Sequence, residues 1–159
     1  MITTLKPYDL NDVISNMQRM SSEGVQDAQV QMLTSVALMA GKTDNPIESI
    51  FDFVLVNYRY GPEEGEVLWH PRVLAGDYFL YPDPFSRSAI DCDDFAMLTA
   101  TMLKLCGVDA HMILADTDGD GQVDHAYAEA NTGLGWLSVD TSSKTLPLGW
   151  YINGGRMVI

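Results

Sequence analysis

Positively charged residues are scarce in this sequence. It has 9 Lys and Arg residues against 22 Asp and Glu residues, which gives a formal net charge of −13. Because nucleic acids and anionic membrane surfaces bind proteins through clustered positive charge, this balance argues against both as partners. The charge favours solubility, and attraction of a basic substrate is the other interpretation that the sequence leaves open.

Long apolar runs are also missing. Residues 1–7 contain no apolar core of a signal peptide, and no stretch approaches the length of a membrane-spanning helix. We therefore expect a protein of the cytoplasm. Hydrophobic residues nevertheless make up 47% of the 159 residues, which is enough for one domain with a core of its own.

Cysteine is rare, with only Cys92 and Cys106 in the chain. Both fall at the ends of an apolar run with helical spacing that Gly107 ends. Fourteen helical residues span roughly 21 Å, whereas a disulfide needs Cα atoms within about 7 Å. The two thiols therefore cannot pair with each other, and free thiols suit a reducing compartment.

The first third of the chain is predicted to be helical. Apolar residues recur at helical spacing over 9–20 and again over 25–40, and we place a break at residues 21–24 because Gly24 follows two serines and a glutamate. A third helix begins after Asn45, with Pro46 at its first position and Glu48 as the capping-box partner, and runs to about Asn57.

The remaining segments change in character. Residues 58–90 are rich in proline, glycine and aromatic residues and predict a long irregular segment with one short helix near 71–76, either functional or a hydrophobic cover of the core. After Gly107 the hydrophobic period becomes two, which predicts strands at 108–115, 125–130, 136–140 and 155–159. Helices followed by antiparallel strands are typical of an α+β fold in one domain.

Cys92 lies at the predicted start of its helix, with Asp91 as the N-cap. The unpaired N–H groups and the dipole at a helix start favour a thiolate. The flanking carboxylates of Asp93 and Asp94 oppose this effect, because nearby negative charge raises the pKa of a thiol. The alternative interpretation is a small buried core cysteine.

A base for this thiol is suggested by the last two predicted central strands. If residues 131–134 form a four-residue hairpin loop, His125 faces Asp140 directly across the strands. Opposed residues have Cβ atoms roughly 4.5–5.5 Å apart, so the carboxylate can orient the imidazole. Cys92, His125 and Asp140 then supply a nucleophile, a general base and an orienting group. A surface or core histidine and a strand-ending aspartate are the alternatives for the latter two.

Three motifs in this order resemble the transglutaminase-like superfamily. They are DCDDFA at 91–96 with the following helix, HAYAE at 125–129, and WLSVDTS at 136–142. The segment 45–60 is similar to the part of the family that precedes its substrate cleft. The compact size and the LGW tail at 148–150 resemble small bacterial and phage-encoded members.

The resemblance implies a papain-like α+β fold in which N-terminal helices precede a nucleophile helix packed on a small antiparallel sheet. It implies a single domain over 1–159, with a helical segment at 1–44 and a catalytic core at 45–159. It also implies a cysteine hydrolase or acyltransferase whose triad is Cys92, His125 and Asp140. The reaction stays open, because the superfamily includes cross-linking transglutaminases, proteases, peptide:N-glycanases and inactive proteins.

We therefore expect a thioester-forming enzyme acting on amide bonds of a peptide or protein substrate, with hydrolysis favoured over transamidation. It needs no cofactor for this chemistry. The alternative is a catalytically weak or inactive binding module of the same fold, associated with a virion if a phage encodes it, in which case its location is the host cytoplasm or the virion. The oligomeric state is left open.

An acidic loop at 116–124 matches the first nine positions of a D-x-D-x-D-G calcium loop. Its candidate ligands are Asp116, Asp118, Asp120, the Gln122 carbonyl and Asp124. Position twelve, which calls for glutamate, is Tyr127, so another carboxylate such as Glu129 must complete the site. A metal-free turn rich in Asp and Gly is the alternative interpretation.

Overall fold

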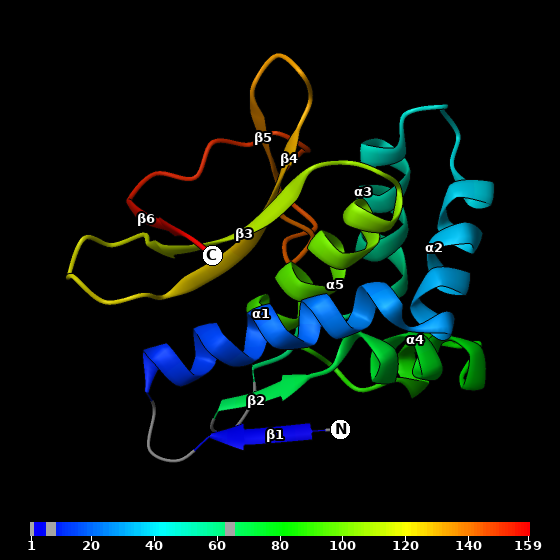
Figure 1. Cartoon of the computed structure of the whole chain (residues 1–159), viewed down its shortest axis with the longest axis horizontal. Coiled ribbons are helices and arrows are strands. Elements are labelled where there is room, and N and C mark those ends of the chain that lie inside the picture. The colour runs from blue at the N-terminus through cyan, green and yellow to red at the C-terminus, as the bar shows by residue number, and fades with distance from the viewer. Residues whose placement is uncertain (1, 6–8, 63–65) are drawn as a thin grey trace.

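A computed structural model describes residues 2–5, 9–62 and 66–159 of the chain. Helices α1 (Leu10–Gln26), α2 (Ala28–Ala40), α3 (Pro46–Asn57) and α4 (Pro71–Leu80) surround helix α5 (Cys92–Leu105), as Figure 1 shows. A four-stranded antiparallel sheet lies beside them in the order β5-β4-β3-β6. Its strands are β3 (Ala110–Asp116), β4 (His125–Asn131), β5 (Trp136–Val139) and β6 (Gly155–Val158). The α+β fold class is confirmed.

Helix α5 is the centre of the molecule. It contacts each of the other four helices and strands β2, β3 and β4. Ten consecutive residues, from Asp94 to Leu103, are buried. One hydrophobic core extends from Val13 on α1 through α5 to Val139 on β5, so the N-terminal helices and the sheet bury their apolar surfaces against the same helix.

The ends of several helices follow the capping residues expected from the sequence. Asn45 caps α3 by accepting a hydrogen bond from the Ile47 N–H, and Asp91 caps α5 by accepting one from the Asp93 N–H. The capping-box role of Glu48 is wrong, because its carboxylate accepts the hydroxyl of Thr43 instead. Satisfying the first N–H groups of each helix fixes where the helix begins.

The expected break at 21–24 is also wrong. Helix α1 continues to Gln26, and Asp27 ends α1 and begins α2 by accepting the N–H groups of Gln29 and Val30. Ser21 stays helical because its hydroxyl is buried against that of Thr101 on α5, at 3.0 Å. Gly24 packs between Thr101 and Pro71, where a Cβ atom would lie 3.0 Å from the Thr101 methyl group.

The segment 58–90 is more regular than predicted. It holds strand β2 (Glu66–Trp69), which pairs antiparallel with β1 (Ile2–Leu5), the ten-residue helix α4, and a short 3₁₀ turn at Pro84–Ser86. Residues 63–65 of this segment lie outside the described part. Arg87 fastens it from within by donating to the carbonyl oxygens of Tyr81, Asn57 and Pro82.

The four-residue hairpin loop exists, but one residue further along the chain. Asn131 pairs with Trp136, so the loop is 132–135 and Asp140 continues the register to a position opposite Tyr127, not His125. The direct opposition of His125 and Asp140 is therefore wrong. Because a shift of one loop residue moves the register by two, His125 and Asp140 still lie on the same face of the sheet, as diagonal neighbours.

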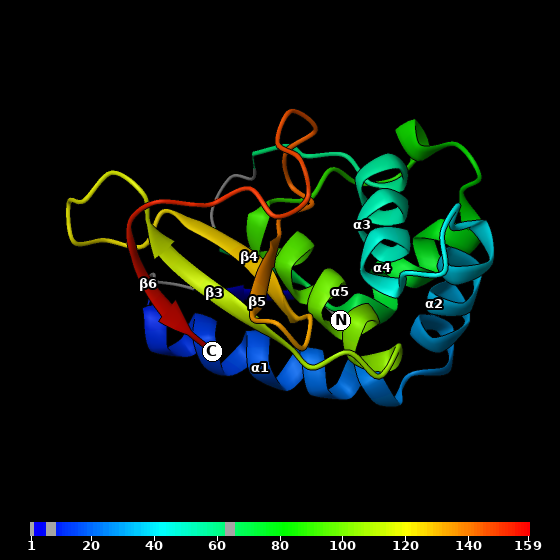
Figure 2. The same ribbon diagram turned by 90° about the horizontal axis from the view of Figure 1, so that it is seen from above.

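Two further features are a protruding loop and the character of the helices. The loop at 116–124, between β3 and β4, extends away from the rest of the molecule in both views (Figures 1 and 2). Within the described residues, no helix is both long enough and apolar enough to cross a membrane.

Candidate active site

The start of α5, the start of β4 and the end of β5 meet at one place. His125 is the first residue of β4, and its Nε2 lies 2.7 Å from Oδ2 of Asp140, which directly follows β5. The Asp140 side chain is 5% exposed and that of His125 is 23% exposed. The structure thus brings together the predicted base and the predicted orienting group.

Asp140 is held as an anion. Burial raises its pKa, but hydrogen bonds from His125 and from the hydroxyl and N–H of Ser142 outweigh burial and leave the pKa below its ordinary value. An ionised carboxylate only accepts hydrogen bonds, so Nε2 of His125 carries the proton that it donates. In the neutral ring, Nδ1 is then the acceptor, and it has no hydrogen-bond partner among the described residues.

Cys92 is the first residue of α5 and lies beside the start of β4. The backbone N–H of Ala126, the residue after His125, donates a hydrogen bond to the Cys92 sulfur. The thiol itself donates to Oδ1 of Asp93 at 3.5 Å. Cys92 and Cys106 stand at opposite ends of α5 and both are free thiols, in agreement with the expectation that they do not pair.

The environment of Cys92 opposes ionisation of its thiol. Burial raises the pKa of the Cys92 thiol, the carboxylates of Asp93 and Asp91 raise it further, and the Ala126 N–H acts in the opposite direction. Asp94 does not contribute to this effect. Its buried carboxylate accepts the backbone N–H of Trp69 at 2.7 Å and so fastens α5 to β2.

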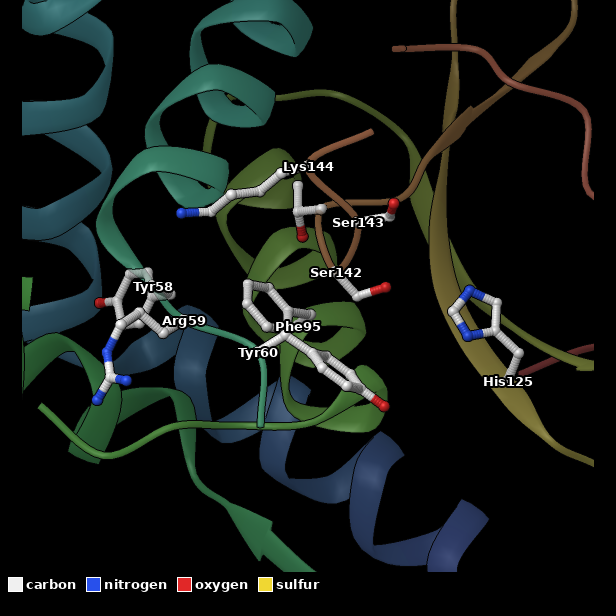
Figure 3. A pocket seen from close by; sticks show the side chains of 9 residues that line it. Tyr58, Arg59, Tyr60, Phe95, His125, Ser142, Ser143 and Lys144 are labelled. Carbon is white, nitrogen blue, oxygen red and sulfur yellow. The ribbon is translucent and has the colours of Figure 1, made fainter. Parts of the chain in front are cut away.

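A cleft of about 560 Å³ opens beside His125 (Figure 3). Its walls come from the exit of α3, from α5 and from the turn after β5, and are formed by Tyr58, Arg59, Tyr60, Phe95, His125, Thr141, Ser142, Ser143 and Lys144. The rings of Tyr60 and Phe95 stack with their centroids 6.5 Å apart and form its apolar wall. A cleft of this size accommodates an extended peptide segment or a small molecule.

Several residues that shape this site were not predicted from the sequence. Ser142 orients Asp140, and a serine two residues after an aspartate is a recognisable turn signal. Thr141 bonds Thr99 of α5 through their buried hydroxyls, at 2.8 Å. No local pattern predicts this contact, because the two residues are 42 positions apart.

The acidic loop assembles only part of the predicted calcium site. Carboxylate oxygens of Asp116, Asp118 and Asp120 lie within 4.8 Å of one another. Asp124 is engaged elsewhere, since its oxygens accept the N–H and the hydroxyl of Thr117. Glu129 does not complete the site, because its buried carboxylate pairs with His111 at 2.9 Å and with Arg156 at 2.6 Å.

Comparison with known proteins adds the family to this geometry. Residues 34–141 match the family model of the transglutaminase-like superfamily. Searches of the curated proteins and of the solved structures returned no match. The matched segment covers more than half of the chain and includes Cys92, His125 and Asp140 as well as all of α3, α4 and α5. By this match, and with the α+β fold that carries it, the chain belongs to the transglutaminase-like superfamily.

Proposed function

We propose that the protein is a cysteine-dependent acyl-transfer enzyme that acts on amide bonds of peptides or proteins. The observation that carries the proposal is the 2.7 Å hydrogen bond between His125 and Asp140 beside a thiol at a helix start. Membership of a superfamily of cysteine hydrolases and acyltransferases supports it. In this proposal Cys92 is the nucleophile, His125 the general base and acid, and Asp140 the orienting group.

The free nitrogen of His125 gives the order of proton transfers. Nδ1 takes the proton of the Cys92 thiol as the sulfur attacks the carbonyl carbon of the substrate, and the carbonyl oxygen becomes an oxyanion. The backbone N–H of Cys92, at the open end of α5, can donate to that oxygen. His125 then returns the proton to the leaving amine, the C–N bond breaks, and a thioester remains on Cys92.

The second half of the reaction repeats these roles. His125 takes a proton from water, whose oxygen attacks the thioester, and the acid is released as the proton returns to the sulfur. An amine in place of water would give a new amide and thus a cross-link. Hydrolysis is the proposed reaction, because the cleft shows no separate site for an amine among its lining residues.

The raised pKa of Cys92 makes general base catalysis the proposed route. A thiol flanked by Asp93 and Asp91 is mainly protonated at neutral pH, so it does not rest as a thiolate paired with imidazolium. The proton must leave during the attack, and only a base at the thiol can accept it. In this proposal His125 is that base.

Thiol alkylation tests the proposal directly. Burial raises the pKa of Cys106 to about 11 and raises that of Cys92 further, so without a base Cys92 should react more slowly than Cys106. We expect the reverse order with iodoacetamide, measured by mass spectrometry of the two cysteine peptides. His125→Ala should slow Cys92 by at least about tenfold and leave Cys106 unchanged.

The matched control is His111→Ala. His111 also forms a histidine–carboxylate pair on the same sheet, with Glu129, but it does not line the cleft. This variant should leave the alkylation of Cys92 unchanged. If Cys92 reacts no faster than Cys106 and does not respond to His125→Ala, the enzyme proposal fails and the inactive binding module is the better description.

A further inference from the structure

Two of the chain's few positive charges line the cleft beside His125. The sequence has 9 Lys and Arg residues against 22 Asp and Glu residues, and Arg59 and Lys144 both form part of the cleft wall. Figure 3 shows them at the end of the cleft opposite His125, with Phe95 and Tyr60 between. The protein is strongly acidic, so this end of the cleft is a local region of positive charge.

The positive charge of these two residues is not neutralised by carboxylates. The Arg59 guanidinium donates to the carbonyl oxygens of Pro84, Phe85 and Arg87, which orient it but carry no net charge. Within the described part of the chain, no carboxylate lies within ion-pair distance of Arg59 or of the exposed Lys144. The Arg59 guanidinium also lies over the Phe85 ring, 5.3 Å from its centroid, on a segment outside the cleft lining. Lys144 is therefore the cation that can meet an anionic group in the cleft, and Arg59 adds positive charge to the same wall.

The other end of the cleft has the opposite charge. Asp140 lies behind His125, and Asp93 and Asp91 flank the thiol. Burial raises the pKa of the Tyr60 hydroxyl, and the carboxylates of Asp91, Asp93 and Asp140 raise it further, so this hydroxyl lies toward the acidic end. An anionic group of a ligand is therefore repelled at the thiol and attracted at the far end.

We propose that the cleft selects peptides in which an acidic side chain accompanies an uncharged reacting amide, the acidic side chain binding at Lys144 with Arg59 adding to the positive charge of that end. This inference rests on the proposed function for the position of the reacting amide, and it adds a substrate class to it. The stacked rings of Tyr60 and Phe95 cover the peptide segment between the two ends. Binding depends on the local charges of the cleft, since the acidic remainder of the surface disfavours acidic peptides elsewhere.

Binding to a Cys92→Ser variant tests this without requiring chemistry. The probes are two fluorescein-labelled peptides that differ only in having glutamate or glutamine beside a central glutamine, followed by fluorescence anisotropy. We expect the glutamate peptide to bind about fivefold more tightly, as partly exposed ion pairs do, and the preference to decline with added NaCl. Lys144→Glu should abolish or reverse it.

Lys42→Glu is the matched control, because it makes the same change of charge on an exposed lysine between α2 and α3, outside the cleft. It should keep the preference for glutamate. Equal binding of the two peptides, binding of neither, or a preference that survives Lys144→Glu overturns the inference. Failure of the alkylation test alone leaves this result intact, so the two proposals are distinguished.

Discussion

In the proposed mechanism, the side chain of Asp93 and the ring of His125 compete for the proton of Cys92. Asp93 accepts the S–H at 3.5 Å and its charge raises the pKa of the thiol, so it retains the proton on sulfur. His125, whose Nε2 is fixed by Asp140, offers Nδ1 as the alternative acceptor. The rate at which Cys92 reacts therefore depends on a carboxylate that takes no part in the proposed chemistry.

Replacing this carboxylate should make the thiol more reactive. Asp93→Asn removes the adjacent negative charge, which lowers the Cys92 pKa and raises the thiolate fraction. Because a less basic thiolate is also a weaker nucleophile, we expect a net gain of roughly threefold in the rate of alkylation near neutral pH.

The control is Asp52→Asn, which removes an exposed carboxylate from α3, outside the cleft. The rate is measured with iodoacetamide as a function of pH. In the Asp93 variant the whole pH profile should shift to lower pH, whereas Asp52→Asn should leave it in place. An unchanged profile in the Asp93 variant would show that this carboxylate does not control the thiol.

The pairing of His125 with Asp140 was predicted from the sequence by an argument that was partly wrong. The loop length was right and its position was off by one residue, which moved the register by two. Because side chains alternate with a period of two, an error of two residues preserves the face of the sheet. The sequence could not give the position of the loop, since Asn131 and Gly135 are both acceptable turn residues.

Among the elements, the link between α5 and the turn after β5 fixes Asp140 relative to Cys92. The hydroxyls of Thr99 and Thr141 are buried and lie 2.8 Å apart, one on α5 and the other next to Asp140. A buried hydroxyl without a partner costs about 1–3 kcal/mol. The pair therefore connects the helix of the proposed nucleophile to the segment of the proposed orienting group.

Thr99→Val should lower both the stability and the thiol reactivity. It leaves the Thr141 hydroxyl without its partner, which should lower the melting temperature by about 2–12 °C and slow alkylation of Cys92. The double variant Thr99→Val/Thr141→Val should recover most of the stability, since both hydroxyls are then absent. Calorimetry and the alkylation assay measure the two effects.

Ser21→Ala is the comparison for this variant. It removes the other buried hydroxyl contact of α5, the one with Thr101 on the side of α1, while Thr101 still donates to the Met97 carbonyl. It should cost stability but leave the reactivity of Cys92 unchanged. If both single variants slow Cys92 equally, the contact at Thr141 has no particular role in positioning the site.

Calcium binding at the loop between β3 and β4 stays a prediction. Three carboxylates lie close together there, and a bound cation would offset their mutual repulsion. At a Ca²⁺ concentration ten times the Kd, binding adds about 1.4 kcal/mol, or roughly 3–6 °C in melting temperature. The measurement is a thermal melt with millimolar CaCl₂ and with chelator, with MgCl₂ at equal ionic strength as the control. Asp118→Asn should reduce the shift, and no shift in the natural chain would remove calcium from the description.

Helix starts set by local contacts were predicted from the sequence, whereas features set by contacts between distant residues were not. Asn45 and Pro46 predict the start of α3 correctly, because capping is a local interaction. The end of α1 was misplaced because Ser21 gains a hydrogen bond from a residue 80 positions away. The pairing of β1 with β2 was likewise missed, since it joins segments that are more than 60 residues apart in the chain.

For the molecule as a whole, the net charge of −13 acts against compactness. Carboxylates repel one another across the surface, and at physiological salt this repulsion is screened beyond roughly 8 Å. We therefore expect the folded state to be less stable at low ionic strength. Raising NaCl from about 0.01 M to about 0.15 M should increase the melting temperature by roughly 2–4 °C, in chelator so that bound cations do not contribute. A melting temperature that falls with salt would mean that attraction within the few ion pairs outweighs the repulsion among carboxylates.

The burial of α5 on all sides has a consequence for the orientation of Cys92, the proposed nucleophile. A helix with one apolar stripe has a single preferred rotation about its axis, but ten consecutive buried residues define no such stripe. Turning this helix by one residue would swing Cys92 through about 100°. Thr99 and Thr101 are two residues apart, so they project to roughly opposite sides, toward Thr141 and Ser21. Together with the hydrogen bond from the Trp69 N–H to Asp94, these two directional contacts favour one rotation of α5 about its axis. The apolar core around them adds stability without favouring one angle.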